Sequence, residues 1–66
     1  MRSIITEITS EQNVLQVRLT KLDNFLAGEN SNLIPKFHKK LLVEQQEHMA
    51  KYLDVLNRRI KLLKGD

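Results

Sequence analysis

The sequence has no cysteine and no tryptophan, and its 66 residues include one proline, two glycines and two histidines. Without cysteine there is no disulfide and no thiolate metal site, and two isolated histidines do not make a zinc cluster. No apolar run reaches the length of a signal peptide or a membrane span, so we expect a soluble cytoplasmic protein with no membrane partner. A chain this short buries a small core, which leaves oligomerisation as the remaining source of stability.

The residue sets that carry out catalysis are also missing. We find no nucleophile with a base and an acid at reinforcing spacing, no glycine-rich phosphate loop and no His-Glu-x-x-His motif. His38 and His48 lie ten residues apart on one expected helix, so we do not expect them to share a metal within a protomer. We therefore expect neither an enzyme nor a bound cofactor or metal.

The charge is uneven along the chain. Residues 1–34 carry three basic and four acidic side chains, whereas residues 35–66 carry eight and four. This excess of positive charge in the second half gives weak support for an anionic partner. The aromatic and glycine signals of known nucleic-acid modules are absent, so we do not expect nucleic acid to be that partner.

Two long stretches with a helical period are separated by one turn. Apolar residues recur every three or four positions on both sides of a Gly- and Asn-containing segment, which predicts helices over about 3–27 and 33–64 and a turn over 28–32. Gly28 is expected to end the first helix with positive φ, Ser31 or Asn32 to cap the second, and Pro35 to lie in its first turn. The fold class is all-α, an antiparallel two-helix hairpin.

The apolar stripes are wider than a contact between two helices requires. Leu41 and Tyr52 broaden the stripe of the second helix, and Phe25 and Phe37 are expected to plug the closed end of the hairpin. Pairing the helices around the turn places Leu19 opposite residue 43. The surplus apolar surface should lie between subunits, so we expect the hairpin to assemble into a homo-oligomeric helical bundle, as a trimer or larger.

Two arginines lie beside the apolar stripes without an intrahelical acid. Arg59 has Val55 and Leu63 as its neighbours four residues away on either side, and Arg18 is placed similarly on the first helix. A guanidinium at a packing surface needs an intersubunit carboxylate, solvent or an anionic ligand. Arg58 differs, because an aspartate precedes it by four residues and favours an ordinary surface pair.

Further cations gather at the two ends of the hairpin. The open end is expected to collect Arg2, Arg58, Arg59, Lys61 and Lys64, partly because cations complement the dipole of a helix C-terminus. Lys36, Lys39 and Lys40 lie in the first turns of the second helix, where that dipole disfavours cations and where phosphate could bind, although a solvated polar face explains them equally well.

Tyr52 faces a polar interruption of the first stripe over residues 10–13. Its ring could stack on a nucleotide base, or it could pack between the helices with its hydroxyl bonded to that polar segment.

A ladder of residues resembles a known family. It reads Arg18-Leu19-x-Lys21-Leu22-x-x-Phe25-Leu26, then Leu41-Leu42-x-x-Gln45-x-x-x-Met49-x-x-Tyr52-x-x-x-Leu56-x-x-Arg59-Ile60. Over about residues 14–64 the chain resembles the helical-hairpin domain of phage anti-CBASS and Thoeris anti-defence proteins. From its length we expect it to be without the additional N-terminal helix or domain that contributes pocket walls in some members of that family.

The resemblance implies a sponge in the cytoplasm of an infected bacterial host. Such phage proteins form oligomers, typically hexamers, and sequester cyclic nucleotide signals without cleaving them; the ligand is a cyclic oligonucleotide or a cyclic ADP-ribose derivative. Tyr52 and Arg59 fall on the ladder and are transferred as ligand-binding residues. Charge and position add Arg2, Arg58, Lys36 and Lys40. The alternative is a non-catalytic oligomerising hairpin that acts as a scaffold or binds a partner protein.

Overall fold

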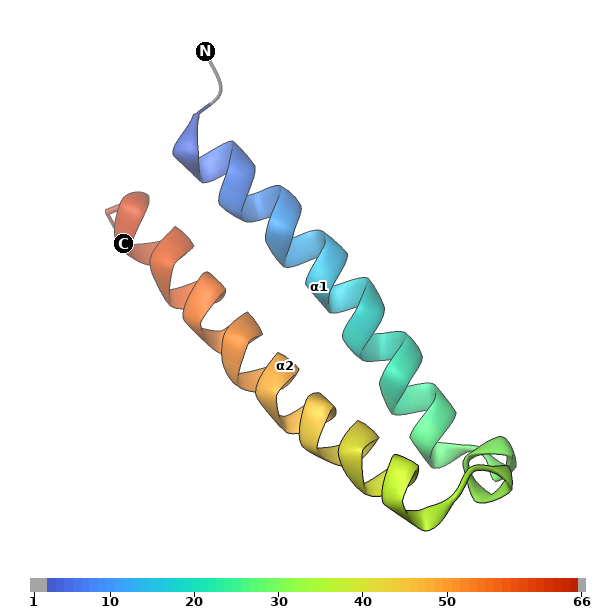
Figure 1. Cartoon of the computed structure of the whole chain (residues 1–66). Coiled ribbons are helices and arrows are strands. Elements are labelled where there is room, and N and C mark those ends of the chain that lie inside the picture. Colours follow the sequence, from blue (N-terminus) through green and yellow to red (C-terminus); the bar gives the residue numbers. More distant parts are fainter. Residues whose placement is uncertain (1–2, 66) are drawn as a thin grey trace.

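The computed structural model describes residues 3–65 and contains two long helices joined by a short one. Helix α1 spans Ile4–Ala27, the 3₁₀ helix η1 spans Glu29–Leu33, and α2 spans Lys36–Leu63. The long helices run antiparallel, which confirms the two-helix hairpin, and the molecule measures 45 × 17 × 16 Å (Figure 1). Within residues 3–65, neither helix has an apolar stretch long enough to cross a membrane.

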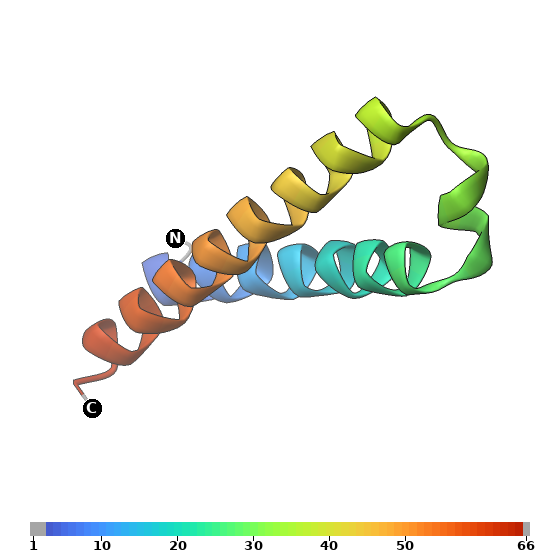
Figure 2. The ribbon, with the colours of Figure 1, turned by 90° about the horizontal axis from the view of Figure 1, so that it is seen from below.

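The core lies in the half of the hairpin that is remote from η1. Ile8 and Leu15 of α1 pack with Leu56 and Ile60 of α2, and Leu56 is fully buried. Figure 2 shows why the core is confined to this half: the helices cross near their free ends and diverge toward η1. The apolar stripes expected from the sequence therefore supply the core residues, but each stripe is buried by the opposite helix along only part of its length.

The connection between the helices differs from the expected turn. Gly28 adopts φ −89° and ψ 166°, an extended conformation open to any residue, so the expectation of a positive φ was wrong. Ser31 is buried, and its hydroxyl donates to the carbonyls of Gly28 at 2.9 Å and Leu26 at 3.3 Å. Ser31 therefore closes the end of α1 and does not cap α2.

Helix α2 begins at Lys36, not near residue 33. Ile34 is extended, at φ −93° and ψ 153°, and Pro35 is the residue that precedes the helix. A proline disfavours helical geometry in the residue before it, so the helix cannot extend back across Ile34. Pro35 itself still accepts the amide of Lys39 on its carbonyl at 3.0 Å.

The longer connection changes the register of the two helices. The side chain of Gln46 donates to Asp23, and that of Gln12 donates to Asn57. In these two contacts the α1 residue meets an α2 residue further along the chain than expected. Phe37, expected as a plug opposite Phe25, is 85% exposed because α2 starts with this residue on its outer side. Phe25 is half-buried. The proposed pairing of these two rings was wrong.

Candidate functional site

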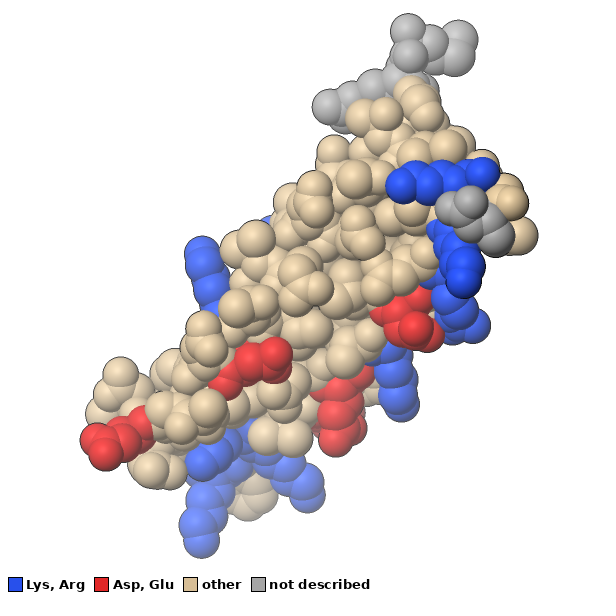
Figure 3. All heavy atoms as spheres, turned by 180° about the vertical axis from the view of Figure 1, so that it is seen from behind, with Lys and Arg blue, Asp and Glu red and all other residues tan. Residues whose placement is uncertain are grey.

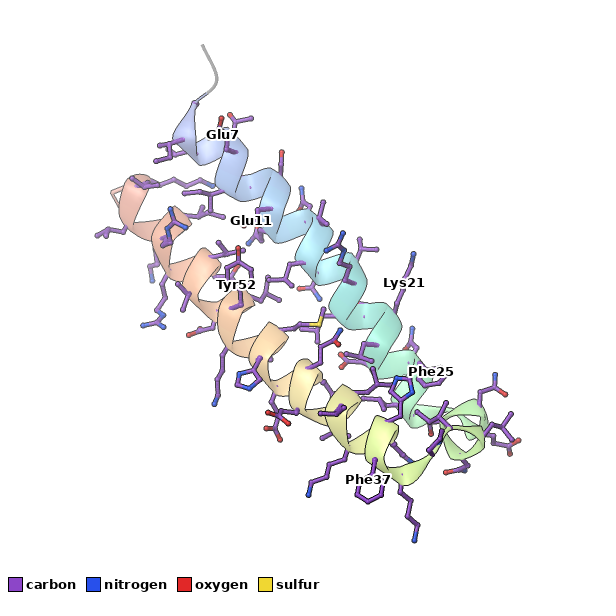
Figure 4. The ribbon with its side chains drawn as sticks, in the orientation of Figure 1. Glu7, Glu11, Lys21, Phe25, Phe37 and Tyr52 are labelled. Atoms are coloured by element: carbon purple, nitrogen blue, oxygen red, sulfur yellow. The ribbon has the colours of Figure 1, made fainter. Side chains whose placement is uncertain are left out.

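A shallow hollow of about 320 Å³ lies between the helices, toward the middle of the hairpin. Its lining consists of five α1 residues and one α2 residue: Ser10, Glu11, Val14, Leu15, Arg18 and Tyr52. This is within the lower range of volumes for small-molecule sites, about 300–1,000 Å³. Figure 4 shows Tyr52 extending from α2 toward α1 beside Glu11.

Helical periodicity brings the α1 residues to one side. Glu11, Leu15 and Arg18 follow one another at intervals of four and three residues, which places them in a row along the helix surface. Leu15 is buried and forms an apolar floor, whereas Val14 is 52% exposed and forms part of the wall. The hollow thus has an apolar base with a negative charge at one end and a positive charge at the other.

Tyr52 is held in this hollow by a hydrogen bond across the helices. Its hydroxyl donates to the Glu11 carboxylate, as in the second of the two arrangements expected from the sequence, in which the polar segment over residues 10–13 bonds the hydroxyl. This hydrogen bond is the main cause that raises the pKa of Tyr52, and desolvation and the negative charge of Glu11 act in the same direction. The phenol is therefore kept neutral and its ring is fixed beside the hollow.

Arg59 extends the site along α2. It follows Tyr52 by seven residues, two helical turns, so both lie on the same side of the helix. Its positive charge partly opposes the rise in the pKa of Tyr52. Arg59 and Arg18 are both exposed, and within residues 3–65 neither forms an ion pair with a carboxylate. Both cations are available to an anionic ligand.

The other expected site residues do not join this cluster. Arg58 is paired with Asp54 at 3.1 Å, which confirms the prediction of an ordinary surface pair. Lys36 lies 23 residues before Arg59, about 35 Å along the helix at 1.5 Å per residue. Lys40 lines a separate depression of about 250 Å³ with Val43, Glu44 and Glu47. The two glutamate carboxylates in this depression offset the positive charge of the lysine. Arg2 lies outside the described residues.

The two charged residues of the hollow, Glu11 and Arg18, were not among the expected ligand-binding residues. Glu11 had been noted only as part of a polar interruption, and Arg18 only as an unneutralised cation beside the apolar stripe. The available signal for both was their spacing of seven residues, which puts them on one helix face on either side of Leu15. That Tyr52 lies across from this row depends on the register of the hairpin.

The comparisons with known proteins give one result. A family model described as Sequestin matches residues 3–62, which includes α1, η1 and nearly all of α2. No curated protein and no solved structure matches the chain.

Proposed function

This chain belongs to the Sequestin family, and from that premise we propose that it binds and sequesters cyclic nucleotide second messengers of bacterial anti-phage defence, of the CBASS or Thoeris type, without cleaving them. The family name points to sequestration. The choice of ligand rests on the residue ladder that ends in Arg59-Ile60 and on the chemistry of the hollow. A phage origin and action in the cytoplasm of the infected host are part of the same proposal.

The observation that carries the proposal is the combination of one fixed aromatic ring with two unpaired guanidiniums. Tyr52 offers a face on which a base can stack, and its hydrogen bond to Glu11 restricts the ring before any ligand arrives. Arg18 and Arg59 can each form paired hydrogen bonds to a phosphate. A nucleotide ligand requires both kinds of contact. Arg18 lines the hollow with Tyr52, and Arg59 follows Tyr52 by two turns of α2.

Binding alone is sufficient for such a function. A sponge acts by mass action: its sites must rival the signal in number, and its dissociation constant must lie below the signalling concentration. In the lining of the hollow, the Glu11 carboxylate accepts the hydrogen bond of the Tyr52 hydroxyl, and we assign this pair to holding the ring. We therefore propose binding without chemistry, and no cofactor.

We further propose that the binding unit is a closed homo-oligomer, a hexamer by resemblance. The hollow is shallow and open on its outer side, where a second protomer could cover a ligand. Val14 and Val17 of α1 and Val55 of α2 remain 41–54% exposed. Figure 3 shows a broad uncharged surface along the hairpin, with the charged side chains mainly at its edges and ends. Such a surface suits contact between copies of the chain.

Titration calorimetry with a panel of cyclic dinucleotides, cyclic trinucleotides and cyclic ADP-ribose isomers tests the proposal. One of these ligands should bind, and Arg59→Ala should weaken its binding more than tenfold, about 1.4 kcal/mol, while helicity is unchanged. Lys51→Ala is the matched control: it removes one exposed positive charge of α2 that lines no described hollow. Equal losses for both variants would exclude a specific role for Arg59.

The alternative function, a scaffold or partner-binding hairpin, is favoured by one observation. Leu33 and Phe37 near the turn are more than 80% exposed, and Leu41 is exposed one turn further along α2. Native mass spectrometry separates the two functions. A closed oligomer that gains integral numbers of one cyclic nucleotide supports the sponge, whereas an oligomer that takes up none of the panel supports the scaffold.

A further inference from the structure

The side of α1 that faces away from α2 carries an exposed row of residues. Glu7, Val14 and Lys21 follow one another at intervals of seven residues, about two turns of helix, so they lie in line along α1. Val17 and Arg18 lie on either side of this line. All five side chains are exposed, and Val14 and Val17 keep 52% and 54% of their surface. We call these five residues the outer face of α1, and Figure 4 shows Lys21 extending from it away from α2.

The middle of the outer face is hollowed and partly apolar. A hollow of about 360 Å³ lies on α1, and its lining consists of Asn13, Val14, Val17, Arg18 and Lys21. Because all of these residues belong to one helix, the hollow is a groove between the side chains of successive turns. When two helices pack, the side-chain ridges of one fill such grooves of the other. The outer face therefore suits another helix.

The two ends of the outer face carry opposite charges. Glu7 lies at the N-terminal end, and Arg18 and Lys21 lie toward the C-terminal end; within residues 3–65 none of the three forms an ion pair. A partner of one charge sign would be repelled at one end. A second α1 in the parallel direction would place like charges together, whereas an antiparallel one brings acid against base at both ends. The outer face is therefore complementary to itself.

We propose that a second copy of this chain packs antiparallel on the outer face of α1, about a two-fold axis at Val14. Val14 then contacts Val14 of the second copy, and Glu7 of each copy pairs with Lys21 of the other. The contact extends over the 14 residues from Glu7 to Lys21, about 21 Å at 1.5 Å per residue. It is isologous, since both copies use the same surface. This inference specifies a contact within the proposed homo-oligomer, and it rests on the proposed function.

The second copy also completes the candidate site. The hollow that contains Tyr52 lies on the Arg18 side of the outer face. A two-fold axis perpendicular to the helices brings the same side of both copies together, so the two hollows adjoin. Arg18 of the second copy comes level with Ser10, at the end of the hollow that lacks a cation in the single hairpin. The assembled site then offers an anionic ligand two guanidiniums and two Tyr52 rings, one of each from either copy.

Cysteine cross-linking tests the position of the axis, because the chain has no cysteine of its own. Val14→Cys should form an intermolecular disulfide under mild oxidation, since residue 14 meets its own copy and the bond requires Cα atoms about 4.4–6.8 Å apart. Gln16→Cys is the matched control: Gln16 is exposed on α1 and lies about half a turn around the helix from Val14. It should run as a monomer on a non-reducing gel. Equal cross-linking of both variants, or none in either, overturns the proposed contact.

Charge reversal tests the pairing of Glu7 with Lys21. Glu7→Lys and Lys21→Glu each place like charges together at both ends of the contact, so each should raise the dissociation constant of the assembly about tenfold or more in analytical ultracentrifugation. The variant that carries both changes restores opposite charges and should recover the wild-type value. Glu47→Lys, at an exposed glutamate of α2, is the control and should leave that constant unchanged. Circular dichroism verifies that every variant remains helical. If the combined variant stays as weak as the single ones, this pairing is wrong.

The outcomes separate this inference from the function on which it rests. If cyclic nucleotides bind but Val14→Cys does not cross-link and the charge variants assemble like the wild type, sequestration stands and the contact through α1 is overturned. If the cross-link and the recovery by the combined variant are both observed but no cyclic nucleotide binds, the contact stands and the proposed function is wrong. A wild-type chain that stays monomeric in ultracentrifugation overturns the contact directly.

Discussion

Tyr52 links the two helices and the candidate site through a single hydroxyl group. The Glu11 carboxylate accepts its hydrogen bond, and this contact favours the neutral phenol over the phenolate. The opposing influence of Arg59 is weaker than the combined effects of the hydrogen bond, desolvation and the charge of Glu11. The pKa of Tyr52 therefore reports directly on whether its hydrogen bond to Glu11 is formed.

The first prediction concerns this pKa. Tyr52 is the only tyrosine and the chain has no tryptophan, so absorbance at 295 nm reports its ionisation alone. The pKa should lie above the usual value of about 10 in the folded protein, and Glu11→Gln should lower it toward that value. A pKa that is the same in both proteins would show that the contact with Glu11 does not form in solution.

The same contact makes stability depend on pH in the alkaline range. The pKa of Tyr52 is higher in the folded than in the unfolded chain, so its stabilising contribution is complete below about pH 10 and is lost as the pH rises through the folded pKa. Urea denaturation of the wild type should therefore show a steeper loss of stability in this range than that of Tyr52→Phe. Parallel losses in the two proteins would contradict the assignment.

Leu56 is the residue on which the core depends most. It is fully buried among Ile8, Leu15 and Ile60. Leu56→Ala should reduce the free energy of unfolding by about 2–5 kcal/mol, because it removes apolar contacts and leaves a cavity. Leu62→Ala, at a leucine of the same helix that is 79% exposed, should change it by about 0.5 kcal/mol or less. Thermal melts followed by circular dichroism measure both.

At the scale of the elements, the connection determines how the helices meet. Ser31 binds the carbonyls at the end of α1, and Pro35 delays the start of α2 to Lys36. Together they lengthen the connection and move α2 along α1 relative to a simple turn. The contact of Tyr52 with Glu11 nevertheless agrees with the pairing expected from the sequence.

Removal of the Ser31 hydroxyl tests this role. Ser31→Ala should cost about 1 kcal/mol of stability, since it leaves the carbonyls of Leu26 and Gly28 without this donor in a nearly buried position. Asn30→Ala, at the exposed preceding residue, should have a smaller effect. Equal urea midpoints for Ser31→Ala and the wild type would show that the connection is held by its backbone alone.

At the scale of the whole molecule, one hairpin covers too little of its apolar surface. Among residues 3–65, the five buried apolar residues lie mainly in one half, and large apolar side chains of both helices remain exposed. A core of this size rarely supplies more than about 3–5 kcal/mol. Association of hairpins would bury more of this surface and raise stability.

The corresponding prediction is that stability depends on protein concentration. If folding is coupled to association, the melting temperature should rise over a tenfold increase in concentration, because association stabilises only the folded form. Light scattering coupled to size-exclusion chromatography should then give a mass above the 7.7 kDa of one chain. If the protein is a monomer and its melting temperature does not depend on concentration, the exposed apolar side chains do not mediate association of the hairpins.

The sequence by itself determined what local physics controls. Periods of three and four residues specify the helices, the only cluster of turn residues places the bend, and a polar interruption opposite Tyr52 predicts a partner for its hydroxyl. Arg59 stands out because none of its neighbours on α2 can neutralise it. Each of these inferences uses either the residues of a single helix or an approximate pairing of the two helices.

The tertiary structure alone decided the features that depend on the exact register and crossing of the helices. The exposure of Phe37, the burial of Ser31 and the presence of Arg18 in the same hollow as Tyr52 follow from where α2 begins and how it diverges from α1. Because both apolar stripes are broad, many alignments of the two helices would bury them almost equally well. The connection selects one of them through hydrogen bonds and a proline, and that selection creates the hollow.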